Sequence, residues 1–411
     1  MSTKRIAFFT LNYAPETTGI APYSTGLAEG LVERGAHVRV FTGFPHYPEW
    51  KRRNGVASNQ TINGVSVQRL EHPVPPRPGM KDRMVMEALF ALRCLRARLD
   101  RPDLLMVVSP SLLSAAAVVL RGRLARIPVV VWVQDLYGLG AAETGMLGGL
   151  GGALLVKLES LILQGASRVV AIHQRFATKL TDIGVDPDKI LVIRNWCHVG
   201  RCPSTVDRQE ARRRQGWHED EFVVLHAGNM GTKQGLENVV EAGRLAEGSS
   251  VRFVLLGDGN QRQKLEQLAA GLGNVTIVDP VADDDFMSTL QAADALLVNE
   301  KETLSDMAVP SKLTSYFAAG RPVVGAVNPA GVTAEEIQSS GAGIVLGAGD
   351  PVALLTGVKN VAGDPDGQRH MSDAGRSYQE RMLQEQVALD AFEALVRTLT
   401  RAKNSHKTRR V

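Results

Sequence analysis

The stretch FVVLHAGNMGTKQG, residues 222–235, decides the fold of this chain. Its first residues form an apolar run that predicts a buried strand, and the glycines and lysine after it predict a turn into a helix. Further apolar runs predict strands at residues 5–10, 37–42, 65–70, 104–108, 129–133, 168–171, 190–193, 252–256, 275–278, 295–298, 323–325 and 343–345. Stretches with helical periodicity lie between most of these runs, for example at 25–34, 80–99, 235–246 and 261–270. This alternation predicts an α/β fold, with parallel strands and helices on both faces of each sheet.

The apolar runs form two series, which predicts two doubly wound domains in a chain of 411 residues, too long for one core. Between the series lie residues 197–207, which contain glycine, proline and serine but few apolar residues. We therefore predict a first domain at 1–198 and a second at 208–375. A helix within 376–400 is expected to pack back on the first domain, and the basic tail at 401–411 is expected to be disordered.

Composition argues against several other classes of protein. The chain has 44% hydrophobic and 22% charged residues and a formal net charge of +4, typical of a globular protein with a slight preference for anionic partners. Aromatic residues make up only 5% and form no basic aromatic stripe, so no nucleic-acid partner is expected. The first residues lack signal-peptide features, and the apolar stretch 104–120 is interrupted by Ser109 and Pro110, which predicts a strand, a turn and a helix. We expect a cytoplasmic protein.

The three cysteines do not form an even disulfide framework, which fits a reducing compartment. Cys197, His198 and Cys202 lie close together in the sequence, but no fourth ligand with the spacing of a zinc site follows them. We therefore expect no metal site.

Glycine-rich loops at the predicted strand ends are the candidate phosphate sites. After the strand at 5–10, Gly19 leaves room for a phosphate at the start of the next helix, unless it only makes a tight turn. In the loop at 227–235 the glycines let amides point inward and Lys233 offers a mobile charge, unless that lysine is simply solvated. The first loop lacks the G-x-G-x-x-G pattern, which argues against a dehydrogenase, and the second is not a P-loop.

Two later strand ends carry similar features. Gly257 begins a loop from which Arg262, in the first turn of the next helix, is able to reach a phosphate oxygen. Further along, the sequence PSKL at 310–313 begins a helix that Gly320 ends. The first amides of that helix form an anion site with the cation of Lys312 beside it.

Four segments, taken together, resemble the retaining glycosyltransferases of family four. They are YAPE with the following glycine at 13–19, IRNW at 193–196, the loop and helix start at 227–237, and PSKL with GRPVV at 310–324. The resemblance extends over nearly the whole chain and implies the glycosyltransferase-B fold, in which two Rossmann-like domains face a central cleft. The subgroup that it resembles most builds bacterial exopolysaccharide and O-antigen units of the colanic-acid type, where a segment similar to FPHYPEW at 44–50 also occurs.

The resemblance also implies roles for individual residues. It implies that Lys233 neutralises the diphosphate of the donor. Lys233 and Asp135 are the predicted catalytic residues; since no covalent nucleophile is needed, Asp135 is expected to position hydroxyl groups of the donor or acceptor, unless it only caps a turn. The implied donor-binding residues are Gly19, Gly228, Asn229, Gly231, Lys233, Gly257, Arg262, Val281, Pro310, Ser311, Lys312, Leu313 and Ser315. The implied acceptor-binding residues are Glu16, His46 and Tyr47.

The sequence departs from the family pattern at the residues that handle the sugar. The two glutamates of the family fall at Met307 and Ser315, which leaves Asp306, Glu302 or Ser315 itself as candidates for contacts with the ribose and the sugar. The histidine of the family after the fifth strand is also missing, as is an arginine beside the second glycine loop.

The function implied is retaining sugar transfer from a nucleoside-diphosphate sugar, with UDP favoured over GDP, to a saccharide or lipid-linked acceptor in exopolysaccharide or glycoconjugate biosynthesis. Lys233 and the amides at helix starts are expected to stabilise the leaving diphosphate, so the transfer is predicted to need neither a metal ion nor a cofactor besides the nucleotide sugar. A sugar-nucleotide 2-epimerase of the same fold and a non-catalytic nucleotide-sugar-binding scaffold are the alternatives.

Residues 77–101 combine basic with apolar side chains, a pattern that predicts an amphipathic helix able to lie on an anionic membrane surface near a lipid-linked acceptor. The inner face of the cell membrane is then a second expected location. The alternative is an ordinary packed helix with a solvated face.

Overall fold

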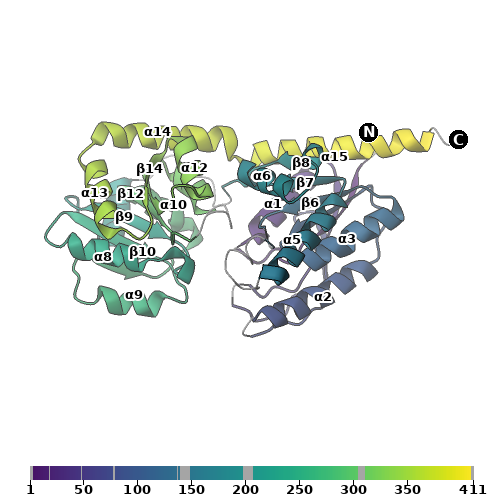
Figure 1. Ribbon diagram of the computed structural model, residues 1–411, viewed down its shortest axis with the longest axis horizontal. Coiled ribbons are helices and arrows are strands. Elements are labelled where there is room, and N and C mark those ends of the chain that lie inside the picture. The colour runs from purple at the N-terminus through teal and green to yellow at the C-terminus, as the bar shows by residue number, and fades with distance from the viewer. Residues whose placement is uncertain are drawn as a thin grey trace. The chain divides into compact units, whose positions relative to one another are not determined.

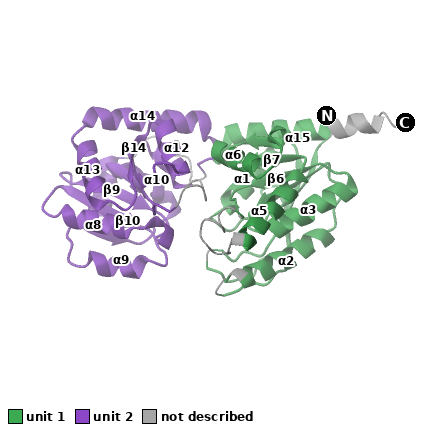
Figure 2. Ribbon diagram, in the orientation of Figure 1, with its two compact units in different colours: residues 1–195, 385–411 green, residues 196–384 purple. Residues whose placement is uncertain are grey.

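The computed structural model describes residues 3–17, 19–47, 49–76, 79–136, 138, 149–197, 207–303 and 311–408. These residues form two compact units, one made of residues 1–195 and 385–411 and the other of residues 196–384 (Figure 2). Each unit has its own sheet and its own core, so the two are described separately. The linker residues 198–206, which include His198 and Cys202, lie outside the described residues.

The first unit contains an eight-stranded sheet in the order β3-β4-β2-β1-β5-β6-β7-β8 (Figure 1). Its strands are β1 (Arg5–Phe9), β2 (His37–Thr42), β3 (Asn59–Ile62), β4 (Val65–Arg69), β5 (Leu104–Ser109), β6 (Val129–Val133), β7 (Arg168–Ala171) and β8 (Ile190–Val192). Its helices are α1 (Ala21–Glu33), α2 (Met80–Arg96), α3 (Leu112–Ala125), α5 (Gly149–Gln164), α6 (Gln174–Asp182) and α15 (Glu385–Thr408). The apolar stretch at 104–120 forms β5 and the start of α3, as its serine and proline residues predict.

One strand of this sheet was not predicted from the sequence. Three of the four residues of β3 are polar and none is fully buried, so they form no apolar run. The strand pairs with β4 in antiparallel orientation. The turn between the two strands is Asn63-Gly64, with φ angles of 46° and 82°. An Asn-Gly pair with both φ angles positive is typical of a tight β-hairpin, and that dipeptide was the available signal.

The second unit contains a six-stranded parallel sheet in the order β11-β10-β9-β12-β13-β14. Its strands are β9 (Phe222–Ala227), β10 (Val251–Leu256), β11 (Val275–Val278), β12 (Ala295–Asn299), β13 (Val323–Val327) and β14 (Gly343–Gly347). Its helices are α7 (Arg208–Gln215), α8 (Glu237–Leu245), α9 (Arg262–Ala269), α10 (Asp283–Ala292), α11 (Lys312–Ala319), α12 (Val332–Ser340), α13 (Pro351–Ala362) and α14 (Pro365–Met382), and a short 3₁₀ turn, η2, spans Thr232–Gln234.

The central strand β9 is buried on both faces, which explains its nearly continuous apolar sequence. Val223 and Leu225 pack with Tyr316 on one side of the sheet. Val224, which points the opposite way, packs with Phe253 on the other side. The strand order reverses between β9 and β12, and ligands of doubly wound sheets bind at the carboxyl ends of strands at such a reversal.

The end of the chain differs from the prediction. The helix predicted within 376–400 is two helices, since α14 ends at Met382 and α15 begins at Glu385. Tyr378 on α14 donates a hydrogen bond of 2.9 Å to Glu336 of the second unit. Phe392 on α15 contacts Trp132 of the first unit, with ring centroids 5.0 Å apart. The disorder predicted for 401–411 is corrected as far as residue 408, because lysine, arginine and alanine favour helix and no glycine or proline interrupts them.

Candidate functional site

The carboxyl ends of β9 and β10 form a glycine-lined edge in the second unit. The amide of Gly228 donates to the carbonyl of Leu256 at 2.8 Å. A Cβ atom on Gly257, where φ is 142°, would lie only 2.0 Å from the carbonyl oxygen of Gly228. A Cβ on Gly259 would lie 2.5 Å from the carbonyl oxygen of Met230. The glycines that follow β10 are therefore needed so that the two loops can pack backbone to backbone, and this packing fixes the shape of the edge.

A lysine from α11 lies over this edge. The Nζ atom of Lys312 is 3.3 Å from Nε2 of His226, the residue next to the last of β9. The same Nζ is 3.8 Å from the position that a Cβ on Gly228 would occupy. Lys312 as a residue keeps a small exposed surface, but its ammonium group is enclosed, and burial lowers the pKa of Lys312 to about 8. The result is a fixed cation at the reversal of the strand order.

The histidine beside this lysine is fully buried. Burial and the neighbouring Lys312 hold the pKa of His226 well below its ordinary value, so its ring is neutral and Nε2 is able to accept a hydrogen bond from the ammonium group. His226 was not selected from the sequence. The available signal was a polar residue within the apolar run that leads into the glycine loop.

The end of β12 supplies two further polar residues beside the same edge. The amide nitrogen Nδ2 of Asn299 donates to the carbonyls of Gln234 at 2.7 Å and Gly235 at 3.0 Å, which attaches the glycine loop to the sheet. Glu300 follows it and accepts a hydrogen bond of 2.9 Å from the hydroxyl of Thr333. Burial raises the pKa of Glu300, while Thr333 and Lys312 oppose that rise. Both residues were missed because each is a single polar residue at the end of an apolar run.

Lys233 lies in the η2 turn after the glycine loop and differs from Lys312 in its surroundings. Its side chain is exposed and makes no ion pair with any residue that the structure describes. The turn itself is ordered, because the carbonyl of Lys233 accepts from the amide of Lys301 at 3.0 Å and Gln234 Oε1 accepts from the amide of Gly231 at 3.2 Å. The exposed Asn229 precedes this turn. Lys233 is thus a mobile cation on a fixed backbone.

Two other predicted donor residues are engaged within the protein. The guanidinium of Arg262 bonds to Glu266 at 2.8 Å, to Asp279 at 2.7 Å and to the carbonyl of Gly257 at 2.9 Å. The buried hydroxyl of Ser315 donates to the carbonyl of Lys312 at 2.9 Å, within its own helix. In this structure Arg262 joins two strand ends, and Ser315 points at helix backbone rather than toward the glycine edge.

The remaining predicted donor residues of this unit differ in their exposure. Ser311 is exposed and precedes the first turn of α11, and Leu313 is buried in the core. Val281 is half-buried beyond the end of β11. Pro310, Met307 and Asp306 lie outside the described residues, and Glu302 is exposed.

In the first unit, the predicted acceptor residues gather after β1 and β2. Glu16 is buried, and its Oε1 accepts hydrogen bonds from the backbone amides of His46 at 2.7 Å and Tyr47 at 2.8 Å. His46 is only 2% exposed, and its Nδ1 lies 2.9 Å from the carbonyl of Phe44. Glu16 and His46 thus hold the loop in shape. Tyr47 is half-exposed and lies 3.4 Å from the position of a Cβ on Gly19, where φ is 64°.

Asp135 follows β6, so it also lies at the carboxyl edge of its sheet. It is half-buried. The residue before it, Gln134, exchanges two side-chain hydrogen bonds with Asn195, at 2.7 and 3.2 Å, which fixes the strand end. The first unit therefore collects Gly19, Tyr47 and Asp135 at one edge, as the sequence predicts for loops that follow parallel strands.

Helix α2 presents apolar side chains to solvent as well as to the core. Met86, Phe90 and Cys94 are buried on its inner face. On its outer side the exposed apolar residues are Met84, Val85, Leu89, Leu92 and Leu95. We call these five residues the α2 stripe. Exposed basic residues accompany it, and α2 packs against α3, which itself packs against α5 (Figure 1). No helix in the described part of the chain is long and apolar enough to span a membrane.

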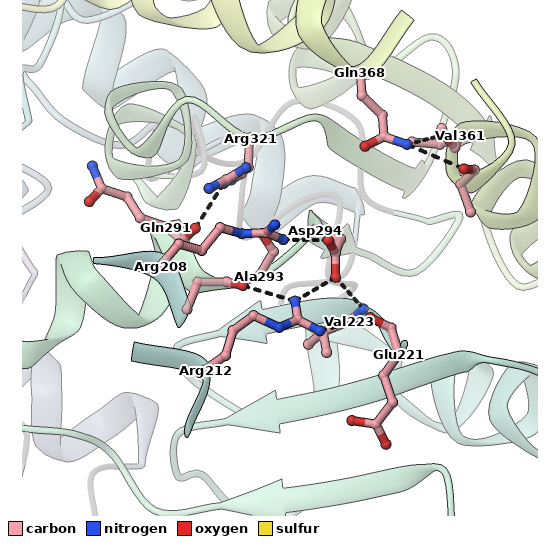
Figure 3. Close-up of polar contacts among 12 residues, drawn as sticks. Arg208, Arg212, Glu221, Val223, Gln291, Ala293, Asp294, Arg321, Val361 and Gln368 are labelled. Atoms are coloured by element: carbon pink, nitrogen blue, oxygen red, sulfur yellow. Dashed lines mark hydrogen bonds and ion pairs between the residues drawn. The ribbon is translucent and has the colours of Figure 1, made fainter. Parts of the chain in front are cut away.

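A second charged cluster of the second unit lies at the opposite, amino edge of its sheet (Figure 3). Asp294, directly before β12, accepts from Arg212 at 2.8 Å and from the amide of Val223 at 2.8 Å, and it also binds Arg208. Nearby, Arg321 donates to the carbonyl of Gln291 at 2.8 Å, and burial lowers the pKa of Arg321 to about 10. The contacts of Asp294 attach α7 to the starts of β9 and β12.

Comparison with known proteins finds two family matches along the chain. Residues 18–196 match the glycosyl transferase 4-like domain, and residues 207–378 match glycosyl transferases group 1. WcaI of Escherichia coli K12, which is named as a glycosyl transferase of colanic acid biosynthesis, is 28% identical over 412 residues, covering 94% of this chain and 98% of WcaI.

Two solved structures show the fold. A sucrose-phosphate synthase from Thermosynechococcus elongatus superposes with a TM-score of 0.75 at 16% identity, covering 97% of this chain and 100% of that one. Anabaena HepE, determined in complex with UDP-glucose, superposes with a TM-score of 0.70 at 15% identity, covering 96% and 99% of the two chains. The likeness confirms the predicted glycosyltransferase-B fold with two parallel-sheet α/β domains.

Proposed function

We propose that this glycosyltransferase, in which a glycosyl transferase 4-like domain precedes a glycosyl transferases group 1 domain, transfers a sugar from a UDP sugar with retention of anomeric configuration. The proposed acceptor is a saccharide or a lipid-linked saccharide of exopolysaccharide biosynthesis, the class named for WcaI. The observation that carries the proposal is the enclosed ammonium of Lys312 over Gly228, at the reversal of the strand order.

The chemistry of this site fits a leaving diphosphate. As the bond between sugar and phosphate breaks, negative charge accumulates on the diphosphate, and cations fixed before the reaction stabilise it most. Lys312 supplies a fixed charge, Lys233 a mobile one, and the first turn of α11 adds the partial positive charge of a helix start. Two lysines thus supply positive charge that a metal ion provides elsewhere, so we propose a metal-independent transfer without a further cofactor.

The choice of UDP rests on relatives of the same fold. HepE structures contain UDP, UDP with glucose, or UDP-glucose. The sugar end of the site is proposed to involve Asp135 as a residue that positions hydroxyl groups, in a front-face reaction or one with a short-lived oxocarbenium-like species. Neither route requires a covalent nucleophile.

Calorimetric titration of the purified full-length chain with UDP, GDP and ADP tests the donor class. We expect UDP to bind more tightly than GDP, and we expect slow release of UDP from UDP sugars, with the released sugar keeping its anomeric configuration by NMR. Conversion of the donor to its C2 epimer without acceptor would identify an epimerase. Tight binding without any turnover of donor would identify a non-catalytic scaffold.

We also propose that the protein works at the inner surface of the cell membrane, where the α2 stripe contacts lipid. Exposed leucines flanked by exposed basic residues are the composition of a helix that lies in an anionic interface. Such a location would bring the first unit close to a lipid-linked acceptor.

A further inference from the structure

Three polar side chains surround the edge over Gly228, and only one of them has a role in the proposed chemistry. Lys312 contacts the ring of His226 at 3.3 Å. Glu300 is held by Thr333 at 2.9 Å, and its charge acts on Lys312 without a direct ion pair. A buried histidine and a half-buried carboxylate beside one enclosed lysine need an explanation, because burying such groups costs free energy.

We propose that His226 and Glu300 are positioning residues of the donor site: His226 fixes the Lys312 ammonium over Gly228, and Glu300 keeps that ammonium charged for the donor's diphosphate. This inference rests on the proposed function, because it assumes that Lys312 binds a diphosphate. It adds two residues that the resemblance to family four does not assign.

The contact with His226 fixes the lysine without neutralising it. An ammonium group has three N–H donors, and among the described residues only His226 accepts from it. A neutral imidazole leaves the positive charge intact, whereas a carboxylate in the same place would cancel it and compete with phosphate. Two N–H groups are therefore left for phosphate oxygens above Gly228.

Glu300 supplies the opposite charge from a distance. Burial lowers the pKa of Lys312 to about 8, and Glu300 raises it. Without that carboxylate, the enclosed amine would lose its proton at a lower pH. Because Thr333 holds the carboxylate and no ion pair forms, Glu300 supports the charge on Lys312 without occupying its N–H groups.

The other titratable groups around Lys312 are placed differently. Tyr316 lies one turn further along α11. Its hydroxyl accepts a hydrogen bond from the amide of Ala227 on β9 and donates one to the carbonyl of Leu297 on β12, and burial raises the pKa of Tyr316 above its ordinary value. Of the helices packed against α11, α14 offers Arg376, which bonds to the carbonyl of Gly320 at the other end of α11. Helix α10 offers only exposed acids in its first turn, among them Asp284. Glu300 is thus the carboxylate that acts on Lys312.

The sign of the pH effect follows from the lysine. As pH rises through about 8, Lys312 loses its charge, and affinity for a diphosphate falls. Glu300→Gln removes the carboxylate that raises the pKa of Lys312, so the fall moves to lower pH. If that pKa drops by about one unit, UDP binding weakens by about twofold at pH 7.0 and about eightfold at pH 8.5.

The test is calorimetric titration of the full chain with UDP between pH 7.0 and 9.5. The variants are Glu300→Gln, the matched control Asp284→Asn with the same change in charge, and Lys312→Arg, whose guanidinium stays protonated over this range. We expect the fall of UDP affinity with rising pH to move to lower pH in Glu300→Gln, to stay in place in Asp284→Asn, and to disappear in Lys312→Arg. If Glu300→Gln folds poorly, the flat profile of Lys312→Arg still tests whether this amine sets the pH dependence.

His226 is tested by a pair of variants. His226→Phe removes the acceptor and is expected to weaken UDP binding by about tenfold at pH 7.0 and 8.5 alike, whereas His226→Gln keeps an acceptor and recovers much of the loss. UDP binding with an unchanged pH profile in Glu300→Gln, or a pH-dependent profile in Lys312→Arg, overturns this inference but not the proposed function. A wild-type protein that binds neither UDP nor GDP overturns both.

Discussion

The two charged clusters of the second unit use charge in opposite ways. At the amino edge of the sheet, Asp294 lies between two guanidinium groups and a backbone amide, so its charge is compensated on several sides (Figure 3). At the carboxyl edge, the ammonium of Lys312 contacts a neutral ring, and Glu300 lies beyond ion-pair distance. A fully paired cluster attaches elements of the fold to one another. A cluster left with net charge and free donors is suited to a charged ligand.

The largest effect is expected at the paired cluster. Asp294→Ala leaves Arg212, which is 4% exposed, as a buried charge without its carboxylate, and we expect the second unit to lose about 3–5 kcal/mol of unfolding free energy. Urea unfolding followed by circular dichroism measures it. The control is Asp366→Ala, an exposed carboxylate paired with Arg369, for which at most about 1 kcal/mol is expected. Equal losses in both variants would contradict the structural role of Asp294.

At the carboxyl edge the expected loss is in function rather than in stability. Lys312→Met removes the fixed cation, and we expect sugar transfer to fall by about 10²–10³-fold, the scale for one preorganised group that stabilises developing charge. The free energy of unfolding should stay the same or rise, because an enclosed ammonium gives way to an apolar side chain. A large loss of stability would show that Lys312 belongs with the structural cluster instead.

A smaller loss is expected for the mobile lysine. Lys233→Ala should leave the protein folded and cut transfer by about 10²-fold in an assay saturated with donor. The exposed Lys301, whose amide bonds to the same turn, provides the control Lys301→Ala, for which near-normal turnover is expected. Near-normal turnover in Lys233→Ala as well would leave Lys312 as the lysine on which transfer depends.

The smallest effect on donor chemistry is expected in the first unit. Replacing Leu89 and Leu92 of the α2 stripe by glutamate should abolish flotation with anionic vesicles at low salt while leaving UDP affinity unchanged. Leu268→Glu, at an exposed leucine of the second unit, is the control. A wild-type chain that does not float with such vesicles rules out this contact with the membrane.

Most strands and the glycine loops could be predicted from the sequence because their signals are local. A strand buried on both faces requires an apolar run, and a close approach such as that of Gly257 to Gly228 requires glycine, so both leave a mark in the sequence. For the mostly polar strand β3, the only signal in the sequence was the Asn-Gly turn that follows it. The break between α14 and α15 left a weaker signal in the sequence, because both helices have apolar stripes and no glycine or proline separates them.

By itself, the sequence determined the α/β class, the two series of strands, and the glycine loops at which we propose that a diphosphate binds. It also placed Lys233 and Lys312 beside those loops, but it had no means of telling an exposed lysine from an enclosed one. Only the tertiary structure decided that, because enclosure depends on packing between residues 86 positions apart, as His226 and Lys312 are. The tertiary structure also paired Arg262 with Asp279, and it directed the hydroxyl of Ser315 to its own helix. It placed Glu300 where its charge raises the pKa of Lys312.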